Sequence, residues 1–242
     1  MSGVTQAHHE RYTSANLHAD EGRTGRLDFI FDLLPPETAQ VLDVGCGPGV
    51  QFLGQVSRRE FTGLDVAREA LDRAEANGYT TIQHDISTGL PVEDARFDLV
   101  VMTDILEHVV DPLGLIKEAH RALRPGGHAL ISVPNHFYLA NRLRILRGKG
   151  LILPWSNHQV YQDFDYFHLR FFRFDSLCSM MDAGGFDVEH DLCDRFLAPM
   201  PAPLSAPIMR TLAYKAAHLT RKTHQDLWAL HLMVIARKRW TD

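Results

Sequence analysis

An apolar run followed by closely spaced glycines is the part of the sequence with the clearest chemical meaning. Residues 41–44 are apolar apart from Asp43, and Gly45, Gly47 and Gly49 follow them. Because glycine has no Cβ atom, the backbone of such a loop can approach a ligand closely. The spacing is not Gly-x-Gly-x-x-Gly, and no Gly-x-x-x-x-Gly-Lys-Ser/Thr occurs, which excludes a P-loop. The pattern predicts a buried strand and a ligand-binding turn before a helix; a turn that binds nothing is the structural alternative.

Acidic residues stand near the ends of two more apolar segments. Asp65 lies near the end of segment 61–66, and Asp85 follows segment 79–83. A carboxylate at the end of the second parallel strand can accept two hydrogen bonds from the hydroxyls of a ribose. Because open α/β sheets bind ligands at the carboxyl ends of their strands, we expect Asp43, Asp65 and Asp85 to line one ligand site.

Histidine supplies the candidates for acid–base chemistry. His108 follows the fourth apolar segment, His136 follows the fifth, and His168 lies in the aromatic stretch 151–174. An imidazole titrates near neutral pH and can take a proton from an alcohol or a phenol. We therefore name His108 and His168 as candidate catalytic residues, with capping of a helix at 111–123 as the structural alternative for His108.

Metal sites and disulfides are not expected. None of the 14 histidines has the spacing of a zinc finger or of a zinc-dependent protease, and three cysteines in 242 residues are typical of free thiols in a reducing compartment. The chain also lacks an N-terminal signal pattern and an apolar run of about 18 residues. These features together predict a cytoplasmic protein.

The elements that must position these residues alternate regularly. Apolar runs predict strands, and amphipathic stretches that end at glycine or proline predict helices. The expected strands are 41–44, 61–66, 79–83, 97–102, 128–133, 186–193 and 228–236, and the expected helices are 27–34, 68–77, 112–123, 175–183 and 208–219. Short links between strands and helices imply right-handed crossovers, which predicts an α/β fold with a parallel sheet and helices on both faces.

On these residues the chain resembles the class I S-adenosylmethionine-dependent methyltransferases, whose first strand and loop read like residues 41–49. The resemblance implies a Rossmann-like fold with a seven-stranded, mostly parallel sheet, and S-adenosyl-L-methionine as the cofactor. It implies that Asp65 binds the ribose hydroxyls, that Asp85 takes the exocyclic amine of adenine, and that Ile86 packs on the adenine ring. The implied cofactor site consists of Asp43, Gly45, Cys46, Gly47, Asp65, Val66, Asp85, Ile86 and Thr103.

Two of these residues have supporting roles in the resemblance. Asp43 would hold backbone amides from behind the glycine loop and reach the methionine ammonium group through water. The backbone of Thr103, which follows the fourth strand, would contact the methionine part of the cofactor.

The resemblance also concerns the acceptor. Residues 97–112 and 121–127 resemble the small-molecule methyltransferases of the ubiquinone pathway and related enzymes. No Asn-Pro-Pro-Tyr or Asp-Pro-Pro-Tyr follows the fourth strand, and the acidic body of the chain offers no basic face to a duplex, which argues against nucleic acid. We therefore expect methyl transfer to a small-molecule acceptor in a biosynthetic or tailoring pathway, at oxygen rather than nitrogen. N-methylation and a lipid intermediate at a membrane surface are alternatives.

The MetW-like proteins of methionine biosynthesis give an alternative of another class. Residues 132–136, 142–149 and 168–172 resemble that group, which implies a regulatory partner of a biosynthetic enzyme with little methyl-transfer activity. However, the stretch 104–108 is closer to active methyltransferases, and the chain after residue 195 is longer than in MetW-like proteins.

Charge and proline are unevenly distributed along the chain, which suggests how it is organised. The net charge is −5, but residues 195–242 hold eight basic and two acidic side chains, so the rest is strongly acidic. We expect one methyltransferase domain over 1–242, with an N-terminal helical cap at 1–39, a substrate lid at 134–173, and a proline-rich linker with an extra basic helix at 195–226. That helix could pack on the domain, contact an anionic membrane or form a dimer, so a monomer and a homodimer both stay open.

Overall fold

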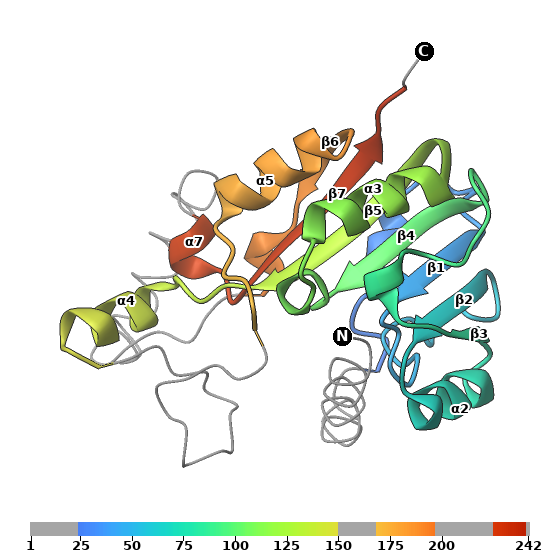
Figure 1. Cartoon of the computed structure of the whole chain (residues 1–242), viewed down its shortest axis with the longest axis horizontal. Coiled ribbons are helices and arrows are strands. Elements are labelled where there is room, and N and C mark those ends of the chain that lie inside the picture. The colour runs from blue at the N-terminus through green and yellow to red at the C-terminus, as the bar shows by residue number, and fades with distance from the viewer. Residues whose placement is uncertain (1–23, 150–167, 197–224, 241–242) are drawn as a thin grey trace.

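A single sheet forms the centre of the molecule (Figure 1). The computed structural model describes residues 24–149, 168–196 and 225–240. Within these residues, seven strands form one sheet in the order β3-β2-β1-β4-β5-β7-β6. The strands are β1 (Gln40–Val44), β2 (Glu60–Asp65), β3 (Thr80–Gln83), β4 (Phe97–Thr103), β5 (Leu123–Pro134), β6 (Phe186–Asp191) and β7 (His231–Lys238). β7 is antiparallel to both of its neighbours, and the other neighbouring strands are parallel, which confirms the predicted fold class.

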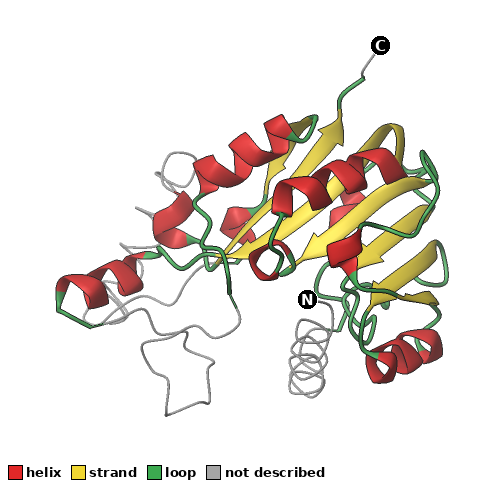
Figure 2. Cartoon of the chain, in the orientation of Figure 1, coloured by secondary structure: helices red, strands yellow, loops and turns green. Residues whose placement is uncertain are grey.

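Helices and short 3₁₀ turns connect the strands. The helices are α2 (Arg68–Ala76), α3 (Pro112–Ala122), α4 (Leu139–Leu146), α5 (Phe174–Ala183) and α7 (Gln225–Trp228), and the 3₁₀ turns are η2 (Asp28–Asp32), η3 (Ile86–Thr88), η4 (Leu106–His108) and η5 (Cys193–Arg195). Figure 2 shows α3 and α5 lying side by side across one face of the sheet.

Both faces of the sheet are covered, because successive residues of the central strand β4 pack into different apolar clusters. Val100 and Met102 pack with buried residues of α3 and α5. Leu99 and Val101 alternate with them and pack with buried residues of η2. Since the side chains of a strand alternate between the two faces, this arrangement requires a layer on each side. The near-continuous apolar sequence of β4 follows from this double burial.

The residues at two helix ends explain why the helices begin and end there, and Gly78 ends α2 as the sequence predicts. The carboxylate of Asp111 accepts a hydrogen bond of 2.8 Å from the backbone N–H of Gly114, and Pro112 is the first residue of α3. Gly78 follows the end of α2 with a φ of +96°, a backbone conformation that favours glycine. The cap of α3 is therefore Asp111, so the structure does not support the capping role considered for His108.

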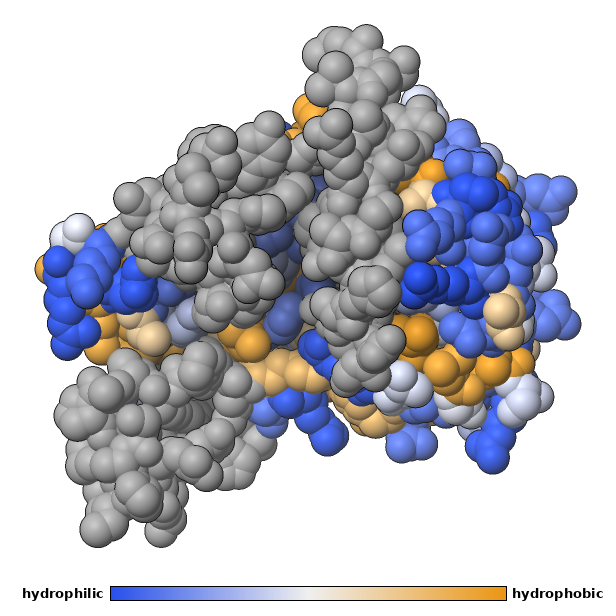
Figure 3. All heavy atoms as spheres, turned by 90° about the horizontal axis from the view of Figure 1, so that it is seen from below, coloured by the Kyte–Doolittle hydropathy of each residue, from blue (hydrophilic) through white to orange (hydrophobic). Residues whose placement is uncertain are grey.

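α4 extends away from the sheet at one end of the molecule (Figure 1). Two apolar residues at its end, Ile145 and Leu146, are exposed, and basic Arg142 and Arg147 are exposed nearby. Figure 3 shows hydrophilic and hydrophobic residues side by side at this end of the molecule. No helix in the described ranges is long and apolar enough to cross a membrane.

Several predicted elements differ in kind or in extent. The stretch 27–34 forms only the 3₁₀ turn η2, and the segment after the glycine loop, residues 51–58, forms consecutive turns instead of a helix. β5 begins at Leu123, well before the predicted start, because Leu123 pairs with Phe97 and a register shift follows. Trp228 ends α7 instead of opening the last strand.

Parts of the predicted domain organisation fall outside the described residues. This applies to residues 1–23 of the helical cap, to residues 150–167 of the substrate lid, and to the basic helix at 208–219. The division into cap, lid and linker stays a prediction.

Candidate functional site

The glycine loop folds back over the end of β2. The backbone N–H groups of Gly45 and Cys46 donate to the carbonyl oxygen of Leu64, at 2.6 and 3.1 Å. Gly45 and Gly47 have φ values of +71° and +52°, which lie in the left-handed region that favours glycine. Cys46 is buried among apolar side chains, in line with a packing role for its thiol. The loop is therefore a tight turn at the carboxyl edge of the sheet, as the sequence predicts.

Asp65, at the end of β2, holds this loop in place. Its carboxylate accepts a hydrogen bond from the N–H of Gly47 at 3.0 Å and another from the N–H of Ala67 at 2.9 Å. The sequence interpretation gave the amide-holding role to Asp43, and the hydrogen bonds of the described residues assign it to Asp65. The physical reason is register: β2 ends beside the loop, so its last residue faces the loop amides. Val66 follows, and its carbonyl accepts a hydrogen bond from Gln83.

Asp43 lies beneath the loop in an apolar environment. Only 1% of the residue is exposed, and the hydroxyl of Tyr79 donates to its Oδ2 at 3.3 Å. Its Oδ1 is buried and has no hydrogen-bond partner among the described residues. Burial raises the pKa of Asp43 to about 7, and the nearby Asp65 adds to the rise. A buried carboxyl with one unsatisfied oxygen fits a ligand that brings a positive charge to this edge, as the ammonium group of S-adenosylmethionine would.

The remaining predicted cofactor residues lie at the ends of β3 and β4. Asp85 follows β3 and accepts a hydrogen bond from the N–H of Ser87 at 2.9 Å, and Ile86 opens η3 against the core. Thr103 is the last residue of β4, and its hydroxyl accepts a hydrogen bond of 3.0 Å from the side chain of Gln51. Because β3, β2, β1 and β4 are parallel neighbours, all of these residues lie along one edge of the sheet.

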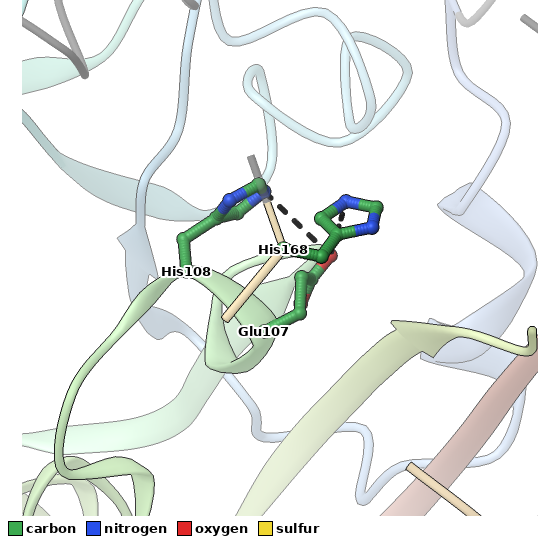
Figure 4. A group of neighbouring side chains, drawn as sticks. All are labelled: Glu107, His108 and His168. Carbon is green, nitrogen blue, oxygen red and sulfur yellow. Dashed lines mark ion pairs between the residues drawn. The ribbon is translucent and has the colours of Figure 1, made fainter. Parts of the chain in front are cut away.

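A group of side chains just beyond β4 brings both candidate catalytic residues together. His108 and Glu107 belong to η4, and the segment that begins at His168 lies against them. The Oε1 of Glu107 is 3.8 Å from Nε2 of His108 and 4.0 Å from Nε2 of His168. Figure 4 shows the two contacts converging on the Glu107 carboxylate. The ring centroids of His108 and His168 are 4.9 Å apart, and all three side chains are buried.

Main-chain hydrogen bonds fasten the His168 segment to η4. The N–H groups of Leu169 and Arg170 both donate to the carbonyl oxygen of Glu107, at 2.8 and 3.2 Å. The guanidinium of Arg170 also donates to the carbonyl of Val110, at 2.6 Å. The position of His168 is thus set by backbone contacts as well as by its side chain.

His136 joins this group from the end of β5. Its Nε2 lies 3.0 Å from Nδ1 of His168, and its ring packs edge-on against Phe171, with centroids 4.6 Å apart. Only 1% of His136 is exposed. We refer to Glu107, His108, His136 and His168 as the histidine cluster. In the sequence, His136 follows the fifth predicted strand and so lies at the same edge of the sheet as His108. That position was the one sign in the sequence that His136 could belong to the histidine cluster.

The histidine cluster lies next to the glycine loop. A Cβ atom added at Gly45 would overlap Cδ1 of Ile105, so Ile105 packs directly on the loop, one residue before η4. The segment that carries His108 therefore begins directly beside the predicted cofactor edge.

The composition of the cluster also suits a cation. The ligand atoms of Glu107, His108 and His168 all lie within 4.8 Å of one another, a grouping that could hold a metal ion. Spacing along the sequence predicted no metal site, and it could not reveal this group, because His168 joins the other two only in the folded chain.

A second histidine–carboxylate pair was missed by the sequence analysis. Asp104, directly after β4, has a φ of +55°, a strained conformation for a residue with a side chain. Its carboxylate lies 3.1 Å from Nδ1 of His231, the first residue of β7, and 3.4 Å from the hydroxyl of Ser132. The three cysteines, Cys46, Cys178 and Cys193, are free thiols, as predicted.

Comparisons with known proteins identify the family. A family model described as a methyltransferase domain matches residues 18–191. Among curated proteins, the ubiquinone biosynthesis O-methyltransferase of Xylella fastidiosa is 34% identical over 150 residues, which cover 57% of this chain and 60% of that protein. Its counterpart in Vibrio cholerae is 31% identical over 154 residues, 59% of each chain. The match thus spans about three-fifths of the length of these curated relatives.

Solved structures share the fold. An S-adenosylmethionine-dependent methyltransferase from Methanosarcina mazei is similar with a TM-score of 0.59 and 20% identity, over 88% of this chain and 98% of that one. Another from Mesorhizobium loti has a TM-score of 0.54 and 22% identity, over 86% and 94%.

Proposed function

Because the chain belongs to the class I S-adenosylmethionine-dependent methyltransferase family, we propose that it transfers a methyl group from S-adenosylmethionine to an oxygen atom of a small-molecule acceptor. The observation that carries this proposal is the contact between the glycine loop and the segment that bears the histidine cluster. This contact supports the proposal, because the segment that carries His108, one of the two candidate bases, begins beside the predicted cofactor edge. The O-methyltransferases among the curated relatives support oxygen as the acceptor atom and a biosynthetic role.

In this proposal the cofactor lies along the carboxyl edge of β1 to β4. S-adenosylmethionine supplies a methyl group that is already activated by its sulfonium. Asp65 would bind the ribose, Asp85 and Ile86 the adenine, and Asp43 would balance the charge of the methionine ammonium group. The remaining residues of the proposed cofactor site are Gly45, Cys46, Gly47, Val66 and Thr103.

The histidine cluster prepares the acceptor. An imidazole nitrogen of His168 or His108 accepts the proton of the acceptor hydroxyl, and the electron pair of the O–H bond stays on the oxygen. The buried Glu107 carboxylate, about 4 Å from both rings, stabilises the imidazolium that forms. The rest of the rate enhancement comes from holding the acceptor oxygen in line with the methyl group.

A turnover assay with matched variants tests the proposal. The purified protein is incubated with S-adenosylmethionine and a panel of phenols and alcohols, and S-adenosylhomocysteine is measured. We expect product with at least one acceptor and a loss of about 10²–10⁴-fold in His108→Gln or His168→Gln, with cofactor affinity kept. His128→Gln is the control, because His128 is also buried and paired with a glutamate, Glu189, but lies outside the cluster.

The negative outcomes are also informative. If turnover falls by less than about fivefold in both His108→Gln and His168→Gln, neither histidine acts as the general base, and a nitrogen acceptor is favoured. Activity lost after EDTA treatment and restored by Mn²⁺ or Zn²⁺ would make Glu107, His108 and His168 metal ligands instead of bases. Cofactor binding without turnover, together with a stoichiometric enzyme partner in pull-downs, would favour the MetW-like regulatory role.

We further propose that the protein works in the cytoplasm as a monomer or homodimer. The free cysteines of the described residues support a reducing compartment. Cell fractionation and light scattering test these statements, and co-sedimentation with anionic but not neutral vesicles would instead support contact with a membrane surface.

A further inference from the structure

We propose that Asp43 links cofactor binding to the release of a proton: its carboxyl is protonated in the protein alone and ionises when the ammonium group of S-adenosylmethionine binds at the glycine loop. The proposal rests on cofactor binding, which the proposed function also requires, but it depends on neither the acceptor nor the histidine cluster. It makes the affinity for the cofactor depend on pH near neutrality.

Asp43 lies in the interior of the sheet, where water does not hydrate its carboxyl. It pairs with Gly63 of β2 on one side and with Val101 of β4 on the other. Only 1% of the residue is exposed. A negative charge on this carboxyl must therefore be stabilised by groups of the protein or by a ligand.

The described side chains around Asp43 give a negative charge little support. The hydroxyl of Tyr79 donates to Oδ2 at 3.3 Å, whereas the buried Oδ1 has no hydrogen-bond partner among the described residues. Asp65 places a second carboxylate nearby, and Asp28 is a further acid that acts on Tyr79. The thiol of Cys46 stays neutral, because burial and the two neighbouring carboxylates raise its pKa. The titratable groups that face Asp43 from the described elements are thus acidic or neutral.

These surroundings favour the protonated carboxyl before the cofactor binds. Burial raises the pKa of Asp43 to about 7, the hydrogen bond from Tyr79 opposes the rise, and Asp65 adds to it. The carboxyl is therefore mostly protonated at about pH 6 and mostly ionised at about pH 8.

The glycine loop brings a bound cation close to this carboxyl. Asp43 is two residues before Gly45, and its partner Tyr79 packs directly on the loop, since a Cβ added at Gly49 would lie 3.0 Å from the Tyr79 ring. A Cβ added at Gly63 would lie 2.7 Å from Sγ of Cys46, so the loop also rests closely on β2. In a region of low dielectric an opposite charge nearby strongly favours the ionised carboxyl.

The step moves one proton and forms no covalent bond. The O–H bond of the Asp43 carboxyl breaks, its electron pair stays on the oxygen, and the proton passes to the buffer. The carboxylate then balances the charge of the ammonium group. The adenine and ribose parts of the cofactor carry no positive charge, so they cannot cause this ionisation by themselves.

Isothermal titration calorimetry of the full-length protein counts the released protons, when each titration is repeated in buffers that differ in ionisation enthalpy. With S-adenosylmethionine we expect release of about one proton at pH 6 and almost none at pH 8, and an affinity about tenfold lower at pH 6. S-adenosylhomocysteine has the same ammonium group and should give the same counts. 5′-Methylthioadenosine lacks the amino-acid part and should release no proton.

Two variants assign the proton to Asp43. Asp43→Asn should remove the release at pH 6, and the difference from wild type excludes protons that come from other groups. Tyr79→Phe loses the hydrogen bond that lowers the pKa of Asp43, so the pH at which affinity falls should move upward. Tyr138→Phe is the control, because Tyr138 is also buried but directly precedes α4, outside the glycine loop, and it should keep the wild-type pH profile.

Binding of S-adenosylmethionine to wild type at pH 6 without proton release would overturn the proposal, and this measurement needs no variant that could misfold. Unchanged release in Asp43→Asn, or equal release with 5′-methylthioadenosine, would also overturn it. Release with S-adenosylmethionine but not with S-adenosylhomocysteine would assign the effect to the sulfonium and contradict the role of the ammonium group. If the proton counts are as expected but no acceptor is methylated, the proposed function fails while the role of Asp43 stands.

Discussion

A carboxyl group with almost no solvent contact lies directly beneath the glycine loop. Burial of Asp43 disfavours its charged form and raises its pKa from 3.8 to about 7, against the opposing hydrogen bond from Tyr79. In the unfolded chain this carboxyl ionises at its ordinary pKa. Between about pH 4 and pH 7 the folded protein therefore holds a proton that the unfolded chain has lost, so the free energy of unfolding falls as the pH rises through this window.

Asp43→Asn mimics the protonated carboxyl and should remove this dependence. In the absence of cofactor we expect the variant to exceed wild type in the free energy of unfolding by about 2–4 kcal/mol at about pH 8, and to equal it at about pH 4. Urea denaturation at the two pH values measures the difference. The same gain at both values would contradict the assigned protonation behaviour.

Asp65 should contribute directly to the affinity for S-adenosylmethionine, in addition to holding the glycine loop in place. We expect Asp65→Ala to weaken S-adenosylmethionine binding by about 1.5–3 kcal/mol in calorimetry, because charge-assisted hydrogen bonds are lost. Asp98→Ala is the matched control: the Asp98 carboxylate also accepts two backbone N–H bonds, from Ala39 and Gln40, but at the start of β4 and thus at the opposite edge of the sheet. Equal effects of the two variants would argue against the assignment of Asp65.

At the scale of the elements, local signals in the sequence were sufficient to predict most strands but insufficient to predict the histidine cluster. Buried strands are visible as apolar runs because both faces of the sheet are covered, and Gly78 marks the end of α2 because its backbone conformation favours glycine. The turns at 51–58 replace a predicted helix, since apolar spacing alone cannot separate the two.

The histidine cluster and the Asp104–His231 pair depend on tertiary contacts. Asp104 and His231 meet because β4, β5 and β7 are successive strands of the sheet, although they are far apart in sequence. His168 reaches Glu107 through hydrogen bonds of its following backbone, which carry no sequence signature. The edge residues could be predicted because each follows its own strand; the partners of His108 could not.

The packing of Ile105, the residue before η4, on the glycine loop gives a prediction for these two parts of the chain. Gly45 has a φ of +71°, and Gly45→Ala introduces a Cβ atom that overlaps the side chain of Ile105. Overpacking of this kind costs about 1–3 kcal/mol, and we expect it to weaken cofactor binding and turnover together. Gly148→Ala is the control, because its φ is +69° but nothing lies within 4 Å of the added atom. Cofactor titration and thermal unfolding compare the two variants, and equal behaviour would contradict the proposed contact.

At the scale of the whole molecule, a ligand that binds across four strand ends should stabilise the entire domain. At a concentration of about 100 times its dissociation constant, S-adenosylmethionine should add about 2.7 kcal/mol to the free energy of unfolding. For a protein of this size that is a rise in melting temperature of about 5–10 °C. Scanning calorimetry with and without the cofactor measures it. The shift should shrink in Asp65→Ala at the same concentration, and an unchanged melting temperature in wild type would contradict cofactor binding.

The position of β7 between β5 and β6 has a consequence for biosynthesis on the ribosome. β5 and β6 are both translated before the strand that separates them, and the buried apolar residues of β5 pair with β7 only when the chain has grown by roughly a hundred residues more. During that interval β5 presents an open strand edge, the kind of surface on which nascent chains associate. A chain whose synthesis stops before β7 therefore lacks the strand that joins β5 to β6. It also lacks His231, the partner of Asp104.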